Sequence, residues 1–388
     1  MKASTLFVAG VLLAGVCLAC SWSSRVLEAS ALDGHASRTI ALKTPRTPLR
    51  SDWRLGAPVS FERLTIFPVI SDQPAASADF ITLDQGLRSG TVVITERGAN
   101  GRSRRIRHRQ VTDAEVNRLA LTNKSGKMLV LIAGEMILGG QQDRIVGHDC
   151  IIEASNTPVP LDVFCVEHGR WSGSSTFGES DGARVASAGR AHGTGAGPGD
   201  SGGQASAIME VVPLALPNVR EKAQARKSQG EVWSAVEETV TINATTTDTL
   251  TLNSVYKDKR VNERLNHYEK RFKGKLSSAN IVGVVAAVGG KIVSADVFAN
   301  HGLFQSYWPK MLKSYALEAV STVDAAKQEV SRTDAEAFLA RAQGTQAADG
   351  KAGVYRLSEN QSAADASFEL EYVKEKPTLV HFNRVAKR

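Results

Sequence analysis

The chain has 388 residues, 42% of them hydrophobic, and a formal net charge of +7 at pH 7. This hydrophobic content can build a core and excludes a wholly disordered protein. The positive charge is concentrated in six arginines between positions 97 and 109. This basic 97–109 segment could bind anionic lipid or phosphate-rich polymers, although a solvated basic loop is the simpler interpretation.

The N-terminus has the features of a secretory signal. Lys2 precedes an uninterrupted apolar run from Leu6 to Ala19. The run is shorter than the ~20 apolar residues that a membrane-spanning helix needs. We therefore expect residues 1–19 to be a signal peptide that is removed on export, leaving the protein extracytoplasmic: secreted, periplasmic or lipid-anchored to the envelope.

Cleavage after Ala19 makes Cys20 the first residue, as in bacterial lipoproteins. Cys17 stands where lipoprotein signals usually carry leucine, so lipidation of Cys20 and free secretion both stay open. Residues 20–55 are polar with little periodicity and are expected to be a tether.

Residues 56–388 are predicted to form one α+β domain. The N-terminal half is expected to be rich in short mixed or antiparallel strands, at 64–70, 80–83, 91–94, 119–122, 128–133, 144–153 and 159–167, with a helical turn at 84–88. A Gly/Ser-rich tract at 172–206 cannot build a packed core and is predicted to be a flexible insertion.

Packed helices are expected in the C-terminal half. They are predicted at 261–272 and 304–319, and a capping box at 333–336 opens a third. Pro309 is compatible with its helix only in the first turn. A hairpin is predicted around Gly289-Gly290, and two further strands at 367–373 and 378–382.

Two cysteines lie in the predicted strands at 144–153 and 159–167. If these strands pair as a hairpin, Cys150 lies opposite Cys165, and His148 opposite Glu167. A cross-strand disulfide would then stabilise the domain by ~3 kcal/mol. Buried thiols beside a His–Glu hydrogen bond are the alternative. A metal site is disfavoured because ligands on one flat strand pair do not converge tetrahedrally, so we predict no metal and no cofactor.

The densest group of chemically active residues lies between 134 and 171. Glu135 and Glu167 are candidate general bases. Glycine-rich turns let backbone amides approach a ligand, and arginines hold anions bidentately. The candidate ligand-binding residues are Gln142, Asp143, Arg144, His168, Arg170 and Trp171. The alternative is structural: Glu135 pairs with Arg144, and Glu167 with Arg170, only to hold the loops.

The same residues carry a family resemblance. Gly134-Glu135, the segment 139–144 (GGQQDR) and the segment 165–171 (CVEHGRW) resemble the ARG-and-rhodanese-phosphatase-superfamily-associated protein domain, where ARG denotes ADP-ribosylglycohydrolase. The segments 229–233 (QGEVW) and 303–319 (LFQSYWPKMLKSYALEA) fit the same pattern. The resemblance implies no established reaction, and it hints at ADP-ribose or nucleotide-linked processes by association alone.

Three functions stay open on the sequence. The leading hypothesis is an exported domain that binds an unknown anionic or glycosidic ligand at the 134–171 loops. The second is a hydrolase acting on a glycosidic or phosphate-containing, ADP-ribose-like substrate, with one glutamate as base and an arginine holding the anion. The third is envelope attachment through the basic 97–109 segment. Nucleic acid is not expected as a partner, because export separates the protein from it.

Overall fold

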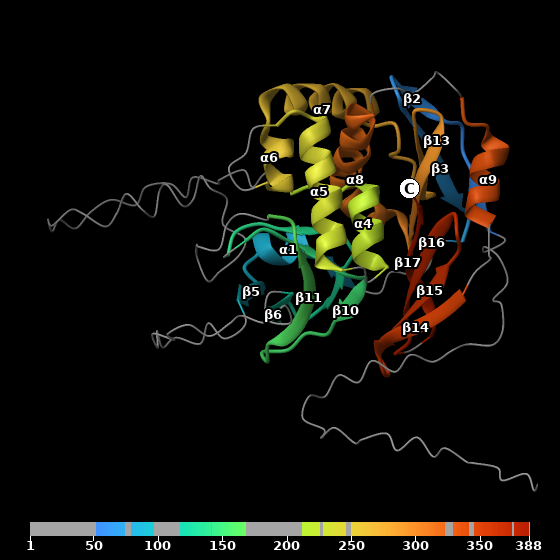
Figure 1. The fold of residues 1–388 in the computed structure, drawn as a ribbon. Coiled ribbons are helices and arrows are strands. Elements are labelled where there is room, and N and C mark those ends of the chain that lie inside the picture. The colour runs from blue at the N-terminus through green and yellow to red at the C-terminus, as the bar shows by residue number, and fades with distance from the viewer. Residues whose placement is uncertain are drawn as a thin grey trace, which may run out of the picture. The chain divides into compact units, whose positions relative to one another are not determined.

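A nine-stranded antiparallel sheet organises the residues that the structure describes (Figure 1). The computed structural model describes residues 52–73, 79–96, 117–140, 142–167, 212–225, 228–245, 250–322, 329–340, 345–374 and 376–387. They all belong to one compact unit, which spans Ser37–Arg388. The predicted signal peptide, the basic 97–109 segment and the Gly/Ser-rich tract lie outside the described residues.

The large sheet draws on both ends of the chain. Its order is β1-β3-β12-β13-β17-β16-β15-β14, with β2 also paired to β3. The strands are β1 (Trp53–Leu55), β2 (Val59–Phe61), β3 (Leu64–Ser71), β12 (Ile281–Val288), β13 (Lys291–Phe298), β14 (Thr345–Lys351), β15 (Tyr355–Gln361), β16 (Asp365–Tyr372) and β17 (Thr378–Ala386). Strand β1 lies within the predicted tether, so regular structure starts earlier than the expected residue 56.

Two smaller sheets come from the segment between β3 and the helices. One has the order β10-β7-β4 and the other β5-β6-β11-β9-β8. Their strands are β4 (Phe80–Thr82), β5 (Val92–Glu96), β6 (Arg118–Asn123), β7 (Met128–Leu131), β8 (Met136–Ile137), β9 (Arg144–Val146), β10 (Cys150–Ile152) and β11 (Val159–Cys165), and the short helix α1 (Leu83–Arg88) follows β4.

The prediction of one strand over 144–153 is wrong. The chain leaves the ladder after Val146, so β9 pairs with β11 whereas β10 pairs with β7 in another sheet. Between them, Asp149 is fully buried and its carboxylate accepts a hydrogen bond from the Ala133 amide at 2.7 Å. Because the strand is interrupted here, the Asp149 carboxylate lies in the core.

Helices cover both faces of the large sheet (Figure 1). One side carries α4 (Pro217–Gln224), α5 (Gln229–Ile242), α6 (Leu252–Lys257), α7 (Lys259–Phe272) and α8 (His301–Ser321), and the other carries α9 (Arg332–Ala340). Helix α8 contacts β12, β13 and β3, whereas α9 contacts β1 and β13. None of the described helices combines the length and hydropathy of a membrane-spanning segment.

The helix predictions are largely confirmed. The expected apolar face of α7 is buried: Val261, Leu265, Tyr268 and Phe272. Pro309, however, lies inside α8 rather than in its first turn. The cap of α9 is Ser331, whose hydroxyl accepts from the amide of Asp334 at 3.0 Å, so the predicted capping box is displaced.

The expected α+β class and the hairpin β12–β13 are confirmed. Both turn glycines have positive φ, 56° at Gly289 and 79° at Gly290, which suits a tight hairpin turn. The C-terminal half contains more strand than expected, because β14 and β15 extend the sheet beyond β16.

Candidate functional site

Glu135 lies in the core, not in an open cleft. It follows β7 and is fully buried. Its Oε1 accepts from the Lys310 ammonium at 2.9 Å, and its Oε2 accepts from the Ile132 amide at 2.9 Å. Burial raises the pKa of Glu135, and the Lys310 charge offsets part of that increase. Its ion-pair partner is therefore Lys310 of α8, not the predicted Arg144.

Lys310 joins this pair to a third element. Its ammonium also lies 2.9 Å from Asp84 Oδ2, in the first turn of α1. The Lys310 side chain is 2% exposed and that of Asp84 is 16% exposed. The buried Lys310 ammonium lies between two carboxylates and connects α8 to the small sheets. Such an arrangement indicates a structural role.

The other candidate residues form a second buried cluster around β9 and β11. Gln142 donates to the backbone carbonyl of Glu167 at 2.8 Å, and the Asp143 amide donates to Glu167 Oε2 at 3.0 Å. Arg144, which is fully buried, donates to Gln142 Oε1 at 3.2 Å. Glu167 itself is 4% exposed. The structure thus brings four of the candidates together, and they contact one another, the backbone and neighbouring side chains such as Cys165 and Thr251.

Two further residues tie this second cluster to the helices. The Gln229 side chain at the start of α5 accepts from the Cys165 amide at 2.9 Å and donates to the Cys165 carbonyl at 2.8 Å. Thr251 donates to Asp143 Oδ2 at 3.1 Å. Neither residue is among the candidates predicted from the sequence. For Gln229 the available signal was its place in the family segment 229–233.

The cysteines do not form the predicted cross-strand pair. Both Cys150 and Cys165 are buried free thiols. Cys165 is registered against Arg144, and Cys150 against Leu131 in a different sheet. The predicted register is wrong because it required an unbroken strand over 144–153. Burial raises the pKa of both thiols, which makes them poor nucleophiles.

The remaining candidates, His168, Arg170, Trp171 and Cys20, lie outside the described residues, and their roles stay predictions. Within the described residues, no group of three or more His, Cys, Asp or Glu side chains is arranged to hold a metal ion.

A buried charged centre that was not predicted from the sequence lies between the large sheet and the helices. Asp296 on β13 accepts from Arg220 of α4 at 2.7 Å and from the Tyr315 hydroxyl of α8. His381 on β17 lies between two carboxylates: its Nδ1 is 2.6 Å from Asp149 Oδ2, and its Nε2 is 3.3 Å from Asp296 Oδ1. A signal was present, since Asp296 and His381 each interrupt an apolar strand pattern.

Gly134, which belongs to the family motif, makes room for this buried centre. Its φ is 82°, in the left-handed region that favours glycine. A Cβ there would lie 2.4 Å from Cγ of Arg220. The motif glycine therefore serves the packing of Arg220 rather than the approach of a ligand.

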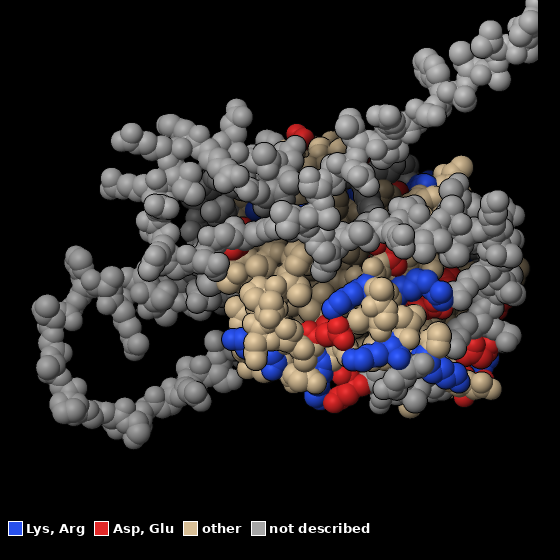
Figure 2. Space-filling view, turned by 90° about the horizontal axis from the view of Figure 1, so that it is seen from below, with Lys and Arg blue, Asp and Glu red and all other residues tan. Residues whose placement is uncertain are grey.

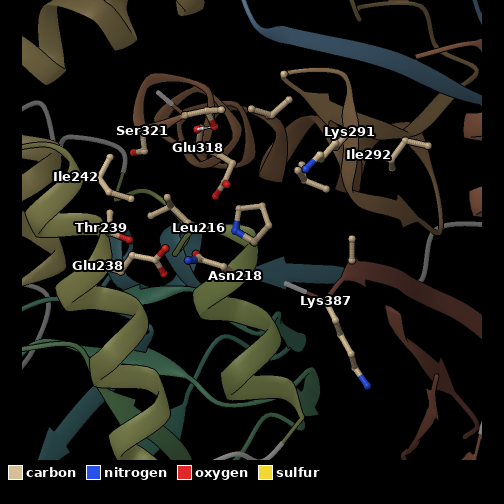
Figure 3. Close-up of a pocket in the computed structure, with 16 residues that line it drawn as sticks. Leu216, Asn218, Glu238, Thr239, Ile242, Lys291, Ile292, Glu318, Ser321 and Lys387 are labelled. Carbon is tan, nitrogen blue, oxygen red and sulfur yellow. Dashed lines mark hydrogen bonds between the residues drawn. The ribbon is translucent and has the colours of Figure 1, made fainter. Parts of the chain in front are cut away.

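A hollow of about 680 Å³ opens away from all these clusters. It lies among the ends of α5 and α8, the start of α4, the β12–β13 turn and the end of β17 (Figure 3). Its polar lining includes Asn218, Glu238, Thr239, Lys291, Glu318 and Ser321. Apolar walls come from residues such as Leu216 and Val293. No candidate from the sequence analysis lines it.

Acidic and basic side chains are interspersed on the face shown in Figure 2. Exposed ion pairs of this mixed kind include Arg118 with Asp162 at 3.3 Å and Lys351 with Glu153 at 2.7 Å. Such pairs contribute little to stability individually.

Comparison with known proteins identifies the family. No curated protein and no solved structure is significantly similar to the chain. The family model described as the ARG and Rhodanese-Phosphatase-superfamily-associated Protein domain matches residues 52–385. That match takes in β1 and most of β17, and hence the whole described fold between them. The chain belongs to the family of ARG and rhodanese-phosphatase-superfamily-associated protein domains.

Proposed function

We propose that the chain is an exported binding domain that takes an anionic or glycosidic ligand in the hollow beside α4, α5, α8 and the β12–β13 turn. The observation that carries the proposal is the hollow itself, whose volume of about 680 Å³ is in the range of small-molecule sites. Asn218 offers the NH2 group of its side chain to a polar ligand, whereas the Thr239 and Ser321 hydroxyls already donate to the Ala235 and Leu317 carbonyls. Lys291 is exposed and has no ion-pair partner among the described residues, so its ammonium is available to an anion.

The proposed site differs from the 134–171 loops that the sequence indicates. A general base must reach the substrate. Glu135 and Glu167 are buried, and each is engaged in its own cluster. A hydrolase that uses either glutamate would have to open the core, whereas binding in the hollow needs no such rearrangement.

Calorimetric titration tests the proposal with ADP-ribose, inorganic phosphate and N-acetylglucosamine as probes. Ile242 lines the hollow and is 41% exposed, so Ile242→Trp narrows the hollow without repacking the core. We expect this variant to weaken binding of the recognised probe by about tenfold, equivalent to 1.4 kcal/mol. Val93→Trp is the matched control, because Val93 is 38% exposed and lies on β5.

Two outcomes contradict the binding function. If Ile242→Trp binds the probe as tightly as the unaltered protein, the hollow is not the site. If the probe is consumed, and Glu167→Gln abolishes turnover while affinity is retained, the hydrolase hypothesis replaces the binding one. Weakened binding by Ile242→Trp, together with no turnover of the probe by the unaltered protein, supports a binding domain.

Export and anchoring are part of the same proposal and have their own test. Mass spectrometry of the mature N-terminus should show either a diacylated Cys20 or a free end near it, and an intact Met1 would contradict export. Envelope attachment through the basic 97–109 segment predicts binding to anionic vesicles that fades steeply as salt is added. Binding that is insensitive to salt removes this third function.

A further inference from the structure

Helices α5 and α8 end at the hollow. Their last turns contribute Thr239 and Ser321 to its lining. Neither helix has a basic side chain in its last turn to balance the partial negative charge of its C-terminus. The C-terminus of a helix carries a partial negative charge of roughly half an electron. Beyond α5, Arg260 donates to the Asn243 and Ala244 carbonyls at 3.3 and 3.1 Å, which offsets part of this charge at α5 only.

Carboxylates add to the negative charge on this side. Glu238 of α5 and Glu318 of α8 both line the hollow, and Figure 3 shows them on the side formed by these helices. Glu238 is exposed and has no ion-pair partner among the described residues. This side therefore favours a cation.

The opposite side of the hollow has the reverse polarity. The start of α4 does not contribute to this side, because Figure 3 shows Leu216 and Asn218 near Glu238, and the Asn218 side chain already accepts from the Val219 amide at 2.8 Å. Lys291 comes from β13, and Figure 3 shows it across the hollow from Glu238. The other lysine, Lys387, is engaged elsewhere, since its ammonium donates to the Ser362 carbonyl at 2.6 Å.

Apolar side chains form another part of the lining of the hollow. Leu216, Val288 and Val293 are buried and belong to the main hydrophobic core. A ligand that matches the whole lining therefore has opposite charges at its two ends and an aliphatic body between them.

We infer that the hollow selects a zwitterion, with its ammonium toward Glu238 and its carboxylate toward Lys291, chemically an amino acid or a short peptide with free ends. This inference rests on the proposed binding function of the hollow and assigns it a zwitterionic ligand in place of an anionic or glycosidic one. An anion alone would satisfy only the side that holds Lys291, and an uncharged sugar would satisfy neither charged side.

Three matched probes separate the contributions of the two charges. Trialanine carries both charges, N-acetyl-trialanine only the carboxylate, and trialanine amide only the ammonium. By calorimetry at pH 7 and low salt we expect trialanine to bind about tenfold more tightly than either capped form, because each cap removes one charge contact.

Two neutralising variants assign each charge to its side. Glu238→Gln should weaken binding of trialanine and trialanine amide about fivefold and leave N-acetyl-trialanine unchanged, as expected for an exposed charge contact. Lys291→Gln should show the opposite pattern. Glu237→Gln and Lys275→Gln are the matched controls, because both residues are exposed and neither lines the hollow.

The outcomes distinguish this inference from the function on which it rests. If N-acetyl-trialanine binds as tightly as trialanine, or if only the sugar and phosphate probes bind in the hollow, the zwitterion inference is wrong and the binding function stands. If no probe of either panel binds, both are overturned. The crossed pattern of the two variants supports both.

Discussion

At the scale of single residues, His381 balances the charge of the buried centre. Two carboxylates, Asp149 and Asp296, face two cations, Arg220 and His381, and all four side chains are fully buried. Burial alone lowers the pKa of His381, but the neighbouring carboxylates outweigh it and raise the pKa to about 9. The imidazole is therefore protonated at neutral pH, and the four charges sum to zero.

Replacing His381 should destabilise the fold strongly. His381→Gln leaves Asp149 and Asp296 with a single cation, and an uncompensated buried charge costs about 3–5 kcal/mol. Urea denaturation measures this as a loss in the free energy of unfolding. The matched control is His267→Gln on the exposed surface of α7, which should stay within about 0.5 kcal/mol. A loss below about 1 kcal/mol for His381→Gln contradicts the charge-balance argument.

The same histidine predicts how stability depends on pH. Its pKa is about 9 in the folded protein against 6.5 as the ordinary value. Because folding raises the pKa, the stabilisation is fully present below pH 6.5 and is lost as the pH rises through 9. The free energy of unfolding should be measured from pH 6 to pH 10 for the unaltered protein and for His381→Gln. The stability gap between them should narrow by about 3 kcal/mol across this range, whereas parallel curves would rule out His381 as the titrating group.

At the scale of single elements, α5 depends on its N-terminal cap. Ser228 and Glu231 form a capping box, in which each side chain accepts from the other residue's backbone amide. The cap matters beyond the helix, because the next residue, Gln229, holds the Cys165 backbone of β11. Local capping thus positions the contact that joins α5 to the second cluster.

Removing that cap should cost a measurable part of the stability. Ser228→Ala leaves the first amides of α5 without a side-chain acceptor, and we expect a loss of about 1 kcal/mol in chemical denaturation. Ser234→Ala, at an exposed position on the same helix, should be neutral within about 0.5 kcal/mol. Equal effects of the two substitutions would show that the cap does not hold the helix.

Helices and strands that are encoded by neighbouring residues form where the sequence predicts them. The β12–β13 hairpin needs only its glycine pair and its apolar flanks, and α7 needs only its apolar spacing. The break between β9 and β10 has a distant cause, since Asp149 turns inward to meet His381, which follows it by more than 200 residues along the chain. A strand prediction made from neighbouring residues contains no such information.

At the scale of the whole molecule, the large sheet contains strands from both ends of the described chain. Strand β17 at the C-terminus lies between β13 and β16 and brings His381 to the buried centre. Strands β1–β3 from the other end pair beside β12. Because neighbours in this sheet are distant in sequence, its stability requires both ends of the chain.

Truncation tests this dependence. A chain that ends at Lys374 lacks β17 and exposes the edges of β13 and β16, so we expect loss of the cooperative thermal transition followed by in circular dichroism. Removal of residues 1–51, which precede both the described residues and the family match, should preserve the transition. A cooperative transition in the C-terminal truncation would contradict the central role of β17.

Local features of the sequence are enough to predict the α+β class, the family, the hairpin and the helices α7 and α8, because propensity, turn glycines and apolar periodicity act over a few residues. The sequence also indicates Glu135, Asp143, Arg144 and Glu167 as candidate site residues, but it does not distinguish a functional role from a structural one. That these side chains face the interior follows from the folded structure alone, because burial and pairing depend on distant segments. Lys310 of α8 pairs with Glu135, and Gln229 of α5 hydrogen-bonds the Cys165 backbone. For the same reason, the hollow that combines the ends of three helices with a hairpin turn exists only in the folded chain.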